Sequence, residues 1–327
     1  MNKFKYYFIL LIITLFISSC TKNEVAVILP PRDYNVQYTT DITDIEEYLK
    51  NNYITVVDHP GFLDDQDVTI SKITDAPNQP SIYSYLNATT FPKLLIHEVK
   101  LHDVTNNYKL YYLVLREGVG QSPCNVDGVL AAYKGEYLQK VAATTTVAET
   151  ITASGFEEVK YPQTILGLYS TILGWSEIFP QFKAGTYTSN LDGTVSHNDF
   201  GAGVMFIPSG LAYYGSGSGS IPSYSPLVFS FKLYEIQRLD IDNDGIPSYL
   251  EDFDGDGYMR NLAAGVDNPD DTDKDGIPNF LDVDDDGDNY TTKLEIKNPA
   301  TGLSYPFADI PSCTLGVKNY LDKTCHP

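Results

Sequence analysis

The size and charge of the chain exclude several classes of protein. Its 327 residues are 43% hydrophobic and 13% aromatic, which is enough apolar material for roughly two domain-sized cores and does not fit a disordered chain. The net charge of −21 argues against nucleic acid as a partner, because neutralising phosphates takes clustered Lys and Arg. Most of this charge is local, since residues 240–288 hold 17 Asp or Glu and only two basic residues.

The N-terminus has the pattern of a secretory signal peptide. A basic start precedes the apolar run 6–17, which is too short to span a bilayer, and small residues lead into Cys20. This resembles the lipobox of bacterial lipoproteins, which implies cleavage after residues 1–19 and a lipid on the sulfur of Cys20. Thr21, in place of Asp, then favours the outer membrane of the bacterial envelope, with periplasmic and surface-facing orientations both open. The alternative is an ordinary signal with an incidental cysteine.

The next region combines a tether, a helix and weaker signals. Residues 20–36 contain a Pro-Pro step and no helical period, as expected of a tether. Apolar residues then recur at helical spacing: Ile42, Ile45, Tyr48, Leu49 and Tyr53. Asp41 and Asp44 stand where carboxylates favour the N-terminal end of a helix dipole. We therefore expect one amphipathic helix in an N-terminal region that extends to residue 109.

The middle of the chain reads as strands around one short helix. Apolar stretches bounded by Gly and Pro predict strands at 110–115 and 129–133, and residues 227–234 alternate so that one face is strongly apolar. A helical stripe lies between them: Trp175, Ile178, Phe179 and Phe182. Pro180 should shorten that helix and Gly185 should end it. The fold class is α+β, an antiparallel sheet packed against a helix.

Three stretches of this region, taken in order, resemble the FKBP-type peptidyl-prolyl cis-trans isomerases. They are "EGVGQSP" with "DGVLAAYKG", "ILGLYSTILGWSEIFPQFKAG" and "IPSGLAYYGSGSGSIPSYSPLVFSFKLYEI". The resemblance covers residues 110–237 and implies a twisted antiparallel sheet wrapped on a short helix, with an aromatic-lined proline pocket between them. Isomerisation of an X-Pro bond needs no nucleophile, metal or cofactor, because a dry pocket that favours the twisted amide lowers the barrier.

The resemblance assigns a role to each residue of this pocket. Trp175 would be the floor under the proline ring, and Ile172 beside it would offer its backbone N–H to the substrate carbonyl. Walls and rim would come from other elements: Tyr133 and Phe229 as walls, Tyr213 from a glycine–serine flap, and Ile221 from its far side. Taken singly, each of these residues is also ordinary core. As an ordered set they favour an isomerase that acts on proline-containing polypeptides and assists folding of exported proteins.

The sequence departs from the FKBP pattern in several places. A Phe-Asp pair usually follows some ten residues after the tyrosine aligned with Tyr133, where this chain has "QKVAATTTVAETI". A second wall aromatic falls near Tyr161, and either Tyr213 or Tyr214 can face the pocket. Residues 186–200 are an insertion. These departures favour the alternative, a catalytically weak or inactive FKBP-like lipoprotein for surface binding or adhesion.

The acidic segment has the ligand spacing of calcium loops, with oxygen donors at positions 1, 3 and 5, a turn residue at 6 and a carboxylate at 12. The candidate ligands are Asp240, Asp242, Asp244, Glu251, Asp252, Asp254, Asp256, Asp271, Asp273, Asp275, Asp282, Asp284, Asp286, Asp288 and Glu295. With its repeated "DGIP", the segment resembles thrombospondin type-3-like repeats, which implies structural calcium. The alternatives are a solvated acidic linker and a regulatory role in which calcium closes the tail over the pocket.

Three cysteines remain after Cys20, and Cys313 and Cys325 can close a small loop that leaves Cys124 unpaired. The predicted organisation is a signal peptide (1–19), a tether (20–36), a small N-terminal region (37–109), an FKBP-like isomerase domain (110–237), loop-rich acidic calcium-binding repeats (238–296) and a tail (297–327). The expected partners are polypeptide clients and, through the lipid, the membrane.

Overall fold

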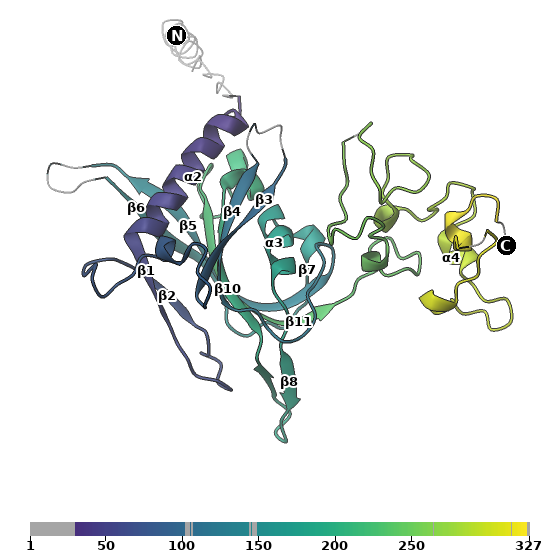
Figure 1. Cartoon of the computed structure of the whole chain (residues 1–327), viewed down its shortest axis with the longest axis horizontal. Helices are drawn as coiled ribbons and strands as arrows, with labels where there is room; N and C mark the ends of the chain where they lie inside the picture. Colours follow the sequence, from purple (N-terminus) through teal and green to yellow (C-terminus); the bar gives the residue numbers. More distant parts are fainter. Residues whose placement is uncertain are drawn as a thin grey trace, which may run out of the picture. The chain divides into compact units, whose positions relative to one another are not determined.

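The computed structural model describes residues 30–101, 105, 107–143, 145, 149–263, 265–314 and 316–325 (Figure 1). The expected signal peptide, Cys20 and most of the tether lie outside the described residues. Residues Asp33–Pro327 make up one compact unit. Among the helices that the structure describes, none is both long enough and apolar enough to cross a membrane.

The core of the unit is a seven-stranded antiparallel sheet. Its order is β3 (Lys93–Val99), β4 (Tyr108–Arg116), β10 (Gly201–Ile207), β11 (Leu227–Gln237), β5 (Gly128–Val141) and β6 (Thr150–Val159), with β7 (Leu166–Gly167) paired to β5. A mostly antiparallel sheet with few helices is consistent with an FKBP-like fold. The predicted strands at 110–115, 129–133 and 227–234 are all present, and β3 extends the sheet to residues that precede position 110.

Both faces of the sheet are buried. In β4, Leu110, Tyr112 and Val114 pack on the side of α3 (Leu173–Ile178), whereas Tyr111 and Leu113 pack on the side of α2 (Tyr34–Asn51) (Figure 1). The alternation in residues 227–234 predicted one strongly apolar face, but Val228 and Tyr234 on the other face are buried as well. The N-terminal region provides this second covering layer, which the local alternation pattern could not reveal.

The predicted N-terminal helix is present as α2 and begins earlier than expected. The Asp33 side chain accepts hydrogen bonds from the backbone N–H groups of Asn35 (3.0 Å) and Val36 (3.1 Å), which caps the helix and shortens the expected tether. Tyr53 lies past the helix in β1 (Asn52–Val56), which pairs with β2 (Val68–Lys72).

Because the helix begins at residue 34, Asp41 is not at its N-terminal end, and the expected role in the helix dipole is wrong. Asp41 is instead buried against the turn that opens the flap, where its carboxylate accepts from Ser209 N–H (2.7 Å), Ser209 Oγ (2.6 Å) and Gln37 Nε2 (2.6 Å). Burial raises the pKa of Asp41 to about 6. Helix α2 therefore holds the base of the flap.

Helix α3 is short, as Pro180 predicted. It ends at Ile178 and continues as a single tight turn, Phe179–Gln181. The insertion forms a separate hairpin of β8 (Thr186–Ser189) and β9 (Val195–Asn198). The chain therefore returns to the sheet at β10 without disturbing the helix.

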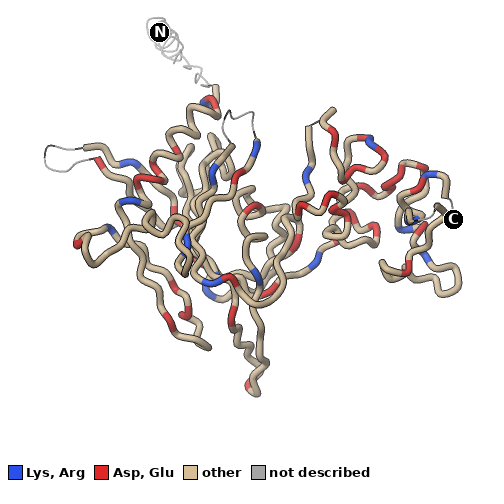
Figure 2. The backbone as a smooth tube through the Cα atoms, in the orientation of Figure 1, with Lys and Arg blue, Asp and Glu red and all other residues tan. Residues whose placement is uncertain are grey.

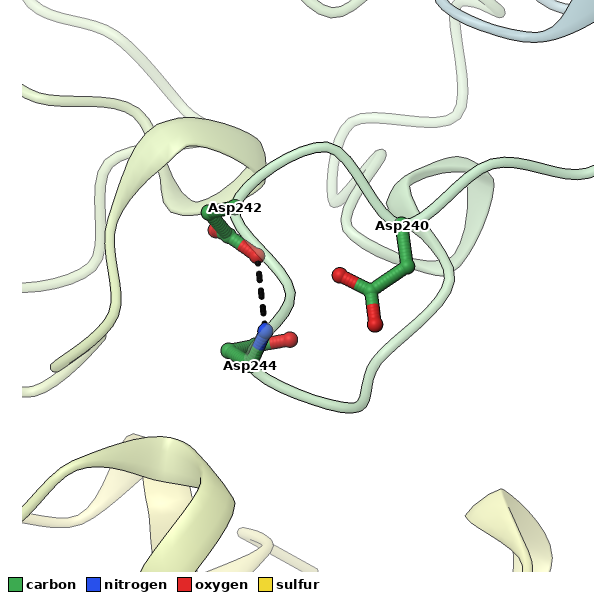
Figure 3. A group of neighbouring side chains, drawn as sticks. All are labelled: Asp240, Asp242 and Asp244. Carbon is green, nitrogen blue, oxygen red and sulfur yellow. Dashed lines mark hydrogen bonds between the residues drawn. The ribbon is translucent and has the colours of Figure 1, made fainter.

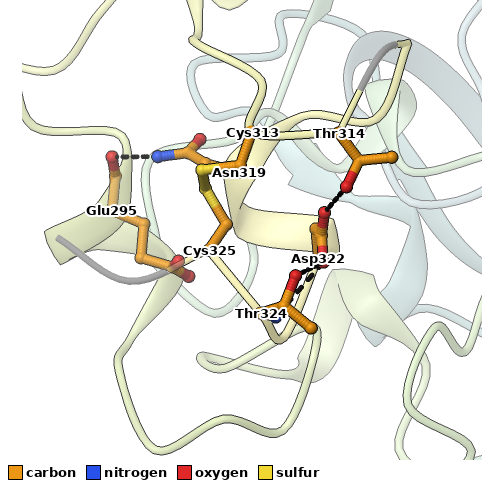
Figure 4. The surroundings of a disulfide bond; sticks show 7 residues. All are labelled: Glu295, Cys313, Thr314, Asn319, Asp322, Thr324 and Cys325. Carbon is orange, nitrogen blue, oxygen red and sulfur yellow. Dashed lines mark hydrogen bonds between the residues drawn. A yellow bond between two sulfur atoms is a disulfide. The ribbon is translucent and has the colours of Figure 1, made fainter.

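The C-terminal segment is nearly all loop, with α4 (Thr292–Glu295) as its α-helix in the described residues. Cys313 and Cys325 form the expected disulfide, and Cys124 is free and buried. Beside the disulfide, Asn319 Nδ2 donates to the backbone carbonyl of Glu295 (2.6 Å), and Thr314 is hydrogen-bonded to Asp322 (Figure 4). The tail is thereby attached to the end of the last acidic loop.

Candidate functional site

Trp175 lies at the centre of an aromatic cluster between α3 and the sheet. Its ring is 4% exposed, with Tyr133 of β5 edge-on at 4.9 Å and Phe229 of β11 edge-on at 5.1 Å. The indole N–H is buried and has no hydrogen-bond partner among the described residues. The structure thus brings together the predicted floor and both predicted walls, with one open donor in an apolar surrounding.

Strand β6 supplies an aromatic and an acid that the sequence analysis missed. Phe156 packs edge-on against Phe229 at 5.6 Å, and the neighbouring Glu157 pairs with Gly135, two residues along β5 from Tyr133. Burial, and then Glu157, raise the pKa of Tyr133 to about 12. Phe156-Glu157 is thus a Phe–acid pair on the strand beside Tyr133. The signal was the "GFEE" stretch, which lies farther along the chain because the β5–β6 hairpin is long.

The close packing of these rings depends on a glycine opposite them. Gly135 pairs with Phe229 on one side and with Glu157 on the other. A Cβ atom at Gly135 would lie 2.4 Å from the Phe156 ring and 2.8 Å from the Phe229 ring. By contrast Tyr161, considered from the sequence as a second wall, is 68% exposed, so that assignment is wrong.

The two tyrosines of the flap have different surroundings. Tyr214 stacks on Tyr34 of α2 at 4.3 Å and meets Tyr224 edge-on at 5.0 Å, so it belongs to the contact with the N-terminal helix. Tyr213 is 38% exposed and lies close enough to Tyr133 to contribute to the raised pKa of that phenol. Of the two, Tyr213 is therefore the one that does not stack on α2.

The two predicted isoleucines also contact this cluster. Ile221 is buried, and two hydrogen bonds close the turn before it, Ser218 N–H to Ile221 C=O (3.1 Å) and the reverse (2.8 Å). The glycine–serine run is therefore a folded turn. Ile172 is the residue before α3, where its backbone carbonyl accepts from the backbone N–H of Trp175 (2.9 Å). Both side chains pack with Trp175 and Phe229 in one hydrophobic cluster.

The back of α3 is bound to the acidic segment. Glu177 is fully buried, and its carboxylate binds His97 Nε2 of β3 at 2.9 Å and Arg260 Nη1 at 2.5 Å. Burial opposes ionisation here, but the hydrogen bonds from His97 and Arg260 outweigh it and lower the pKa of Glu177. The Tyr258 hydroxyl donates to the Glu177 carbonyl (2.9 Å) and accepts from Gln181 (2.8 Å). The helix that carries Trp175 thus contacts both regions.

The acidic segment forms four turns of one kind, which we call the carboxylate loops (240–245, 252–257, 271–276 and 284–289). In each loop the backbone N–H at position 6 donates to the carboxylate at position 1, over 2.9 to 3.1 Å. The Asp244 N–H likewise donates to Asp242 (3.1 Å) in the first loop (Figure 3). Gly245 and Gly276 have positive φ, and Asn289 adopts the same conformation in the loop that lacks the glycine.

Each carboxylate loop gathers three carboxylate oxygens within 4.8 Å of one another. These groups are Asp240, Asp242 and Asp244; Asp252, Asp254 and Asp256; Asp271, Asp273 and Asp275; and Asp284, Asp286 and Asp288. Figure 2 shows acidic positions following one another along this segment. Sets of oxygen donors on flexible loops suit calcium.

The expected position-12 carboxylates are Glu251, Asp282 and Glu295. Glu251 and Glu295 are buried, and none of their carboxylate oxygens has a hydrogen-bond partner among the described residues. Burial raises the pKa of Glu251 to about 11, helped by neighbouring carboxylates, and burial also raises the pKa of Asp282. The sequence analysis missed Asp270, a buried carboxylate that accepts from the Phe253 N–H (2.8 Å) and follows the second loop after an insertion.

Comparison with known families and structures covers parts of the chain. Residues 241–319 match the family described as BamM C-terminal. This match runs past the last carboxylate loop into the tail, and the family that matches is not that of thrombospondin repeats, so the resemblance drawn from the sequence is not supported. No curated protein sequence matches the chain.

Three solved structures resemble the chain in part. A peptidyl-prolyl cis-trans isomerase from Pseudomonas syringae pv. tomato is 21% identical over 46% of this chain and 84% of its own, with a TM-score of 0.29. FkpA from Escherichia coli is 25% identical over 43% of this chain and 52% of its own, with a TM-score of 0.28. The N-terminal domain of FKBP42 from Arabidopsis thaliana is 15% identical over 45% of this chain and 98% of its own, with a TM-score of 0.29.

Proposed function

We propose that the sheet region is a peptidyl-prolyl cis-trans isomerase and that the aromatic cluster around Trp175 is its proline pocket. One observation carries this proposal: Tyr133, Phe229 and Phe156 come from three strands and meet around the floor that Trp175 provides. Aromatic walls with few polar groups suit the ring of a proline in a polypeptide client.

The pocket would act by differential binding of the twisted amide. Rotation about an X-Pro bond is opposed by amide resonance, with a barrier of roughly 18–20 kcal/mol. A twisted carbonyl that has left water loses part of this resonance, and a surface that accepts it better than either planar isomer lowers the barrier. The hydroxyl of Tyr213 and the backbone N–H of Ile172 would orient the substrate carbonyl. No residue acts as a nucleophile in this scheme.

We further propose that the carboxylate loops bind calcium as a structural ion and that a lipid on Cys20 holds the protein in the bacterial envelope, where exported chains fold. The support for calcium is the converging carboxylates, whose mutual repulsion a divalent cation would relieve. The support for the lipid is the sequence before Cys20.

The test of the isomerase is NMR exchange spectroscopy on a short X-Pro peptide with the chain from Thr21 onward, in calcium. The exchange rate is expected to rise in proportion to protein concentration. Tyr213→Phe should lower the acceleration about tenfold, the range of one oriented hydrogen bond in a desolvated site. Tyr214→Phe is the matched control, since Tyr214 packs on α2, and should leave the acceleration unchanged. A folded protein that accelerates nothing would instead be a binding module.

A further inference from the structure

A group of buried carboxylates joins two carboxylate loops that are separate in the sequence. Asp244 comes from the first loop and Glu251 ends it, whereas Asp285 comes from the last loop. One oxygen of each lies within 4.8 Å of the other two. Their exposed fractions are 1%, 0% and 1%. Asp285 was no candidate in the sequence, because it falls between positions 1 and 3 of its own loop.

Most oxygens of these carboxylates have no partner among the described residues; the exception is Oδ1 of Asp244, which accepts from the Ile246 N–H (2.7 Å). Both oxygens of Glu251, both of Asp285 and Oδ2 of Asp244 lack a hydrogen-bond partner among the described residues. Lys293, the basic residue whose charge reaches Asp244, donates its Nζ to the backbone carbonyl of Asn243 (3.1 Å). Buried charges in proteins are paired or bind metals, and this group lacks an ion pair of its own.

A second feature, from a different part of the chain, points to the same place. Tyr320 of the disulfide-closed tail is 0% exposed, and its hydroxyl has no partner among the described residues. The charges that act on this hydroxyl are those of Asp285, Glu251 and Asp244. Tyr320 also packs in one cluster with Ile246, two residues after Asp244, so a buried hydroxyl without a partner lies close to this carboxylate group.

We infer that Asp244, Glu251 and Asp285 together bind one buried calcium ion. The first and last carboxylate loops would then share this ion. The inference rests on the proposed calcium binding of the loops and adds Asp285 as a ligand from outside the first loop. The donors are all oxygen, with no His or Cys that would favour zinc. Backbone geometry supports the position of Asp285, whose N–H donates to the buried Thr292 Oγ1 (3.3 Å).

A shared ion would fix the two ends of the acidic segment to each other and to the tail. Around it, a small hydrophobic cluster has one member directly after the first loop, one after α4 and two from the tail: Ile246, Ile296, Ile310 and Tyr320. Removing the ion would leave three buried carboxyl groups without a cation in the middle of this cluster. The ion is therefore the link that closes the segment.

The test counts bound calcium and measures affinity in the chain from Thr21 onward, which contains the whole compact unit Asp33–Pro327. After chelation, one portion of each variant is dialysed against calcium, and its bound calcium is counted by metal analysis. A second, calcium-free portion is titrated with calcium in a calorimeter to give the affinity. Asp285→Asn should bind one ion fewer than wild type, or bind its tightest ion at least tenfold more weakly. Glu251→Gln should give the same loss, and the double variant should lose no second ion. Asp309→Asn, the same change at an exposed residue of the tail, is the control.

Thermal melting separates this role from an ordinary packing defect. Without calcium, Asp285→Asn removes one of the repelling charges and should melt above wild type; with calcium it should melt below. Wild-type ion count and affinity in Asp285→Asn, or the loss of two ions in the double variant, would overturn the shared site. A wild-type chain that binds no calcium would overturn this inference and the proposed calcium binding together, while peptide exchange would still decide the isomerase.

Discussion

The sheet region and the acidic segment fill their interiors in opposite ways. The sheet buries apolar side chains on both faces, such as Tyr108, Phe206 and Leu227, and the loss of apolar contact with water stabilises it without any ligand. The acidic segment buries Glu251 and Asp285 in its centre, with only small apolar clusters around them. One chain thus contains a part with an apolar interior and a part with buried carboxylates in its interior, which the proposed calcium ions would neutralise.

Calcium removal should have the largest effect, and it should affect the acidic segment and not the sheet. Chelation leaves the carboxylate loops with unopposed charges, so we expect amides of residues 240–296 to lose at least a hundredfold of their hydrogen-exchange protection. Amides of β4, β10 and β11 should keep theirs. The measurement is hydrogen exchange followed by mass spectrometry, with and without EDTA. Uniform loss of protection across the chain would show that the two regions are not separately stabilised.

The pH dependence of stability tests the buried carboxylate of Asp41, on the helix α2 that covers the sheet. Burial raises the pKa of Asp41 from its ordinary value of 3.8 to about 6 in the folded chain. A raised carboxyl pKa stabilises the fold below pH 4, and that contribution is lost as the pH rises through 6. The free energy of unfolding of wild type should therefore fall between pH 4 and 7 by roughly 3 kcal/mol relative to Asp41→Asn. Urea unfolding at the two pH values, in calcium, measures it. Parallel pH profiles of the two proteins would contradict the assignment.

A side-chain carbon added at Gly135, next to the rings of the proposed pocket, should destabilise the fold. Gly135→Ala places a Cβ against Phe156 and Phe229, and overpacking of this kind costs about 1–3 kcal/mol of unfolding free energy. The same substitution at Gly155, on the neighbouring strand, meets nothing within 4 Å and is the matched control. Urea unfolding and peptide exchange of both variants check this. Equal stability and equal acceleration in the two variants would mean that the rings are not tightly packed around Gly135.

The contact between the two regions should have the smallest effect. Tyr258→Phe removes the hydroxyl that links Glu177 and Gln181, which should cost about 1 kcal/mol and change peptide exchange less than twofold. Tyr249→Phe, in a half-exposed tyrosine of the acidic segment, serves as control for the lost hydroxyl. Should Tyr258→Phe abolish the acceleration, the acidic segment would be part of the pocket machinery.

The sequence predicted the features that depend on residues close together in the chain, and it missed those that depend on distant residues. Strands β4 and β11, the short helix before Pro180 and the turns of the carboxylate loops depend on neighbouring residues, and all were predicted. Phe156 and Glu157 were missed because the length of the β5–β6 hairpin, which brings them to Tyr133, is not encoded in a local pattern. Asp285 was missed for a similar reason, since its partners lie more than thirty residues away.

The N-terminal region was the largest gap in the sequence-based account. Its helix was predicted from spacing, but nothing local showed that it would cover the second face of the sheet or that Asp41 would reach Ser209. The identity of the facing tyrosine was open for the same reason, and the contact between Tyr214 and Tyr34 settles that Tyr214 packs on the helix. Contacts between distant segments are what the structure adds.

The central claim is that the proline pocket belongs to the sheet region and needs no ion. The direct measurement is the exchange rate of one X-Pro peptide in a single protein sample, first in calcium and then after chelation. The account predicts acceleration in both states, equal within about threefold, because all residues of the aromatic cluster come from the sheet and α3 and none from the acidic segment. Acceleration that disappears on chelation and returns with calcium would contradict it, because the pocket would then depend on the ion-held segment.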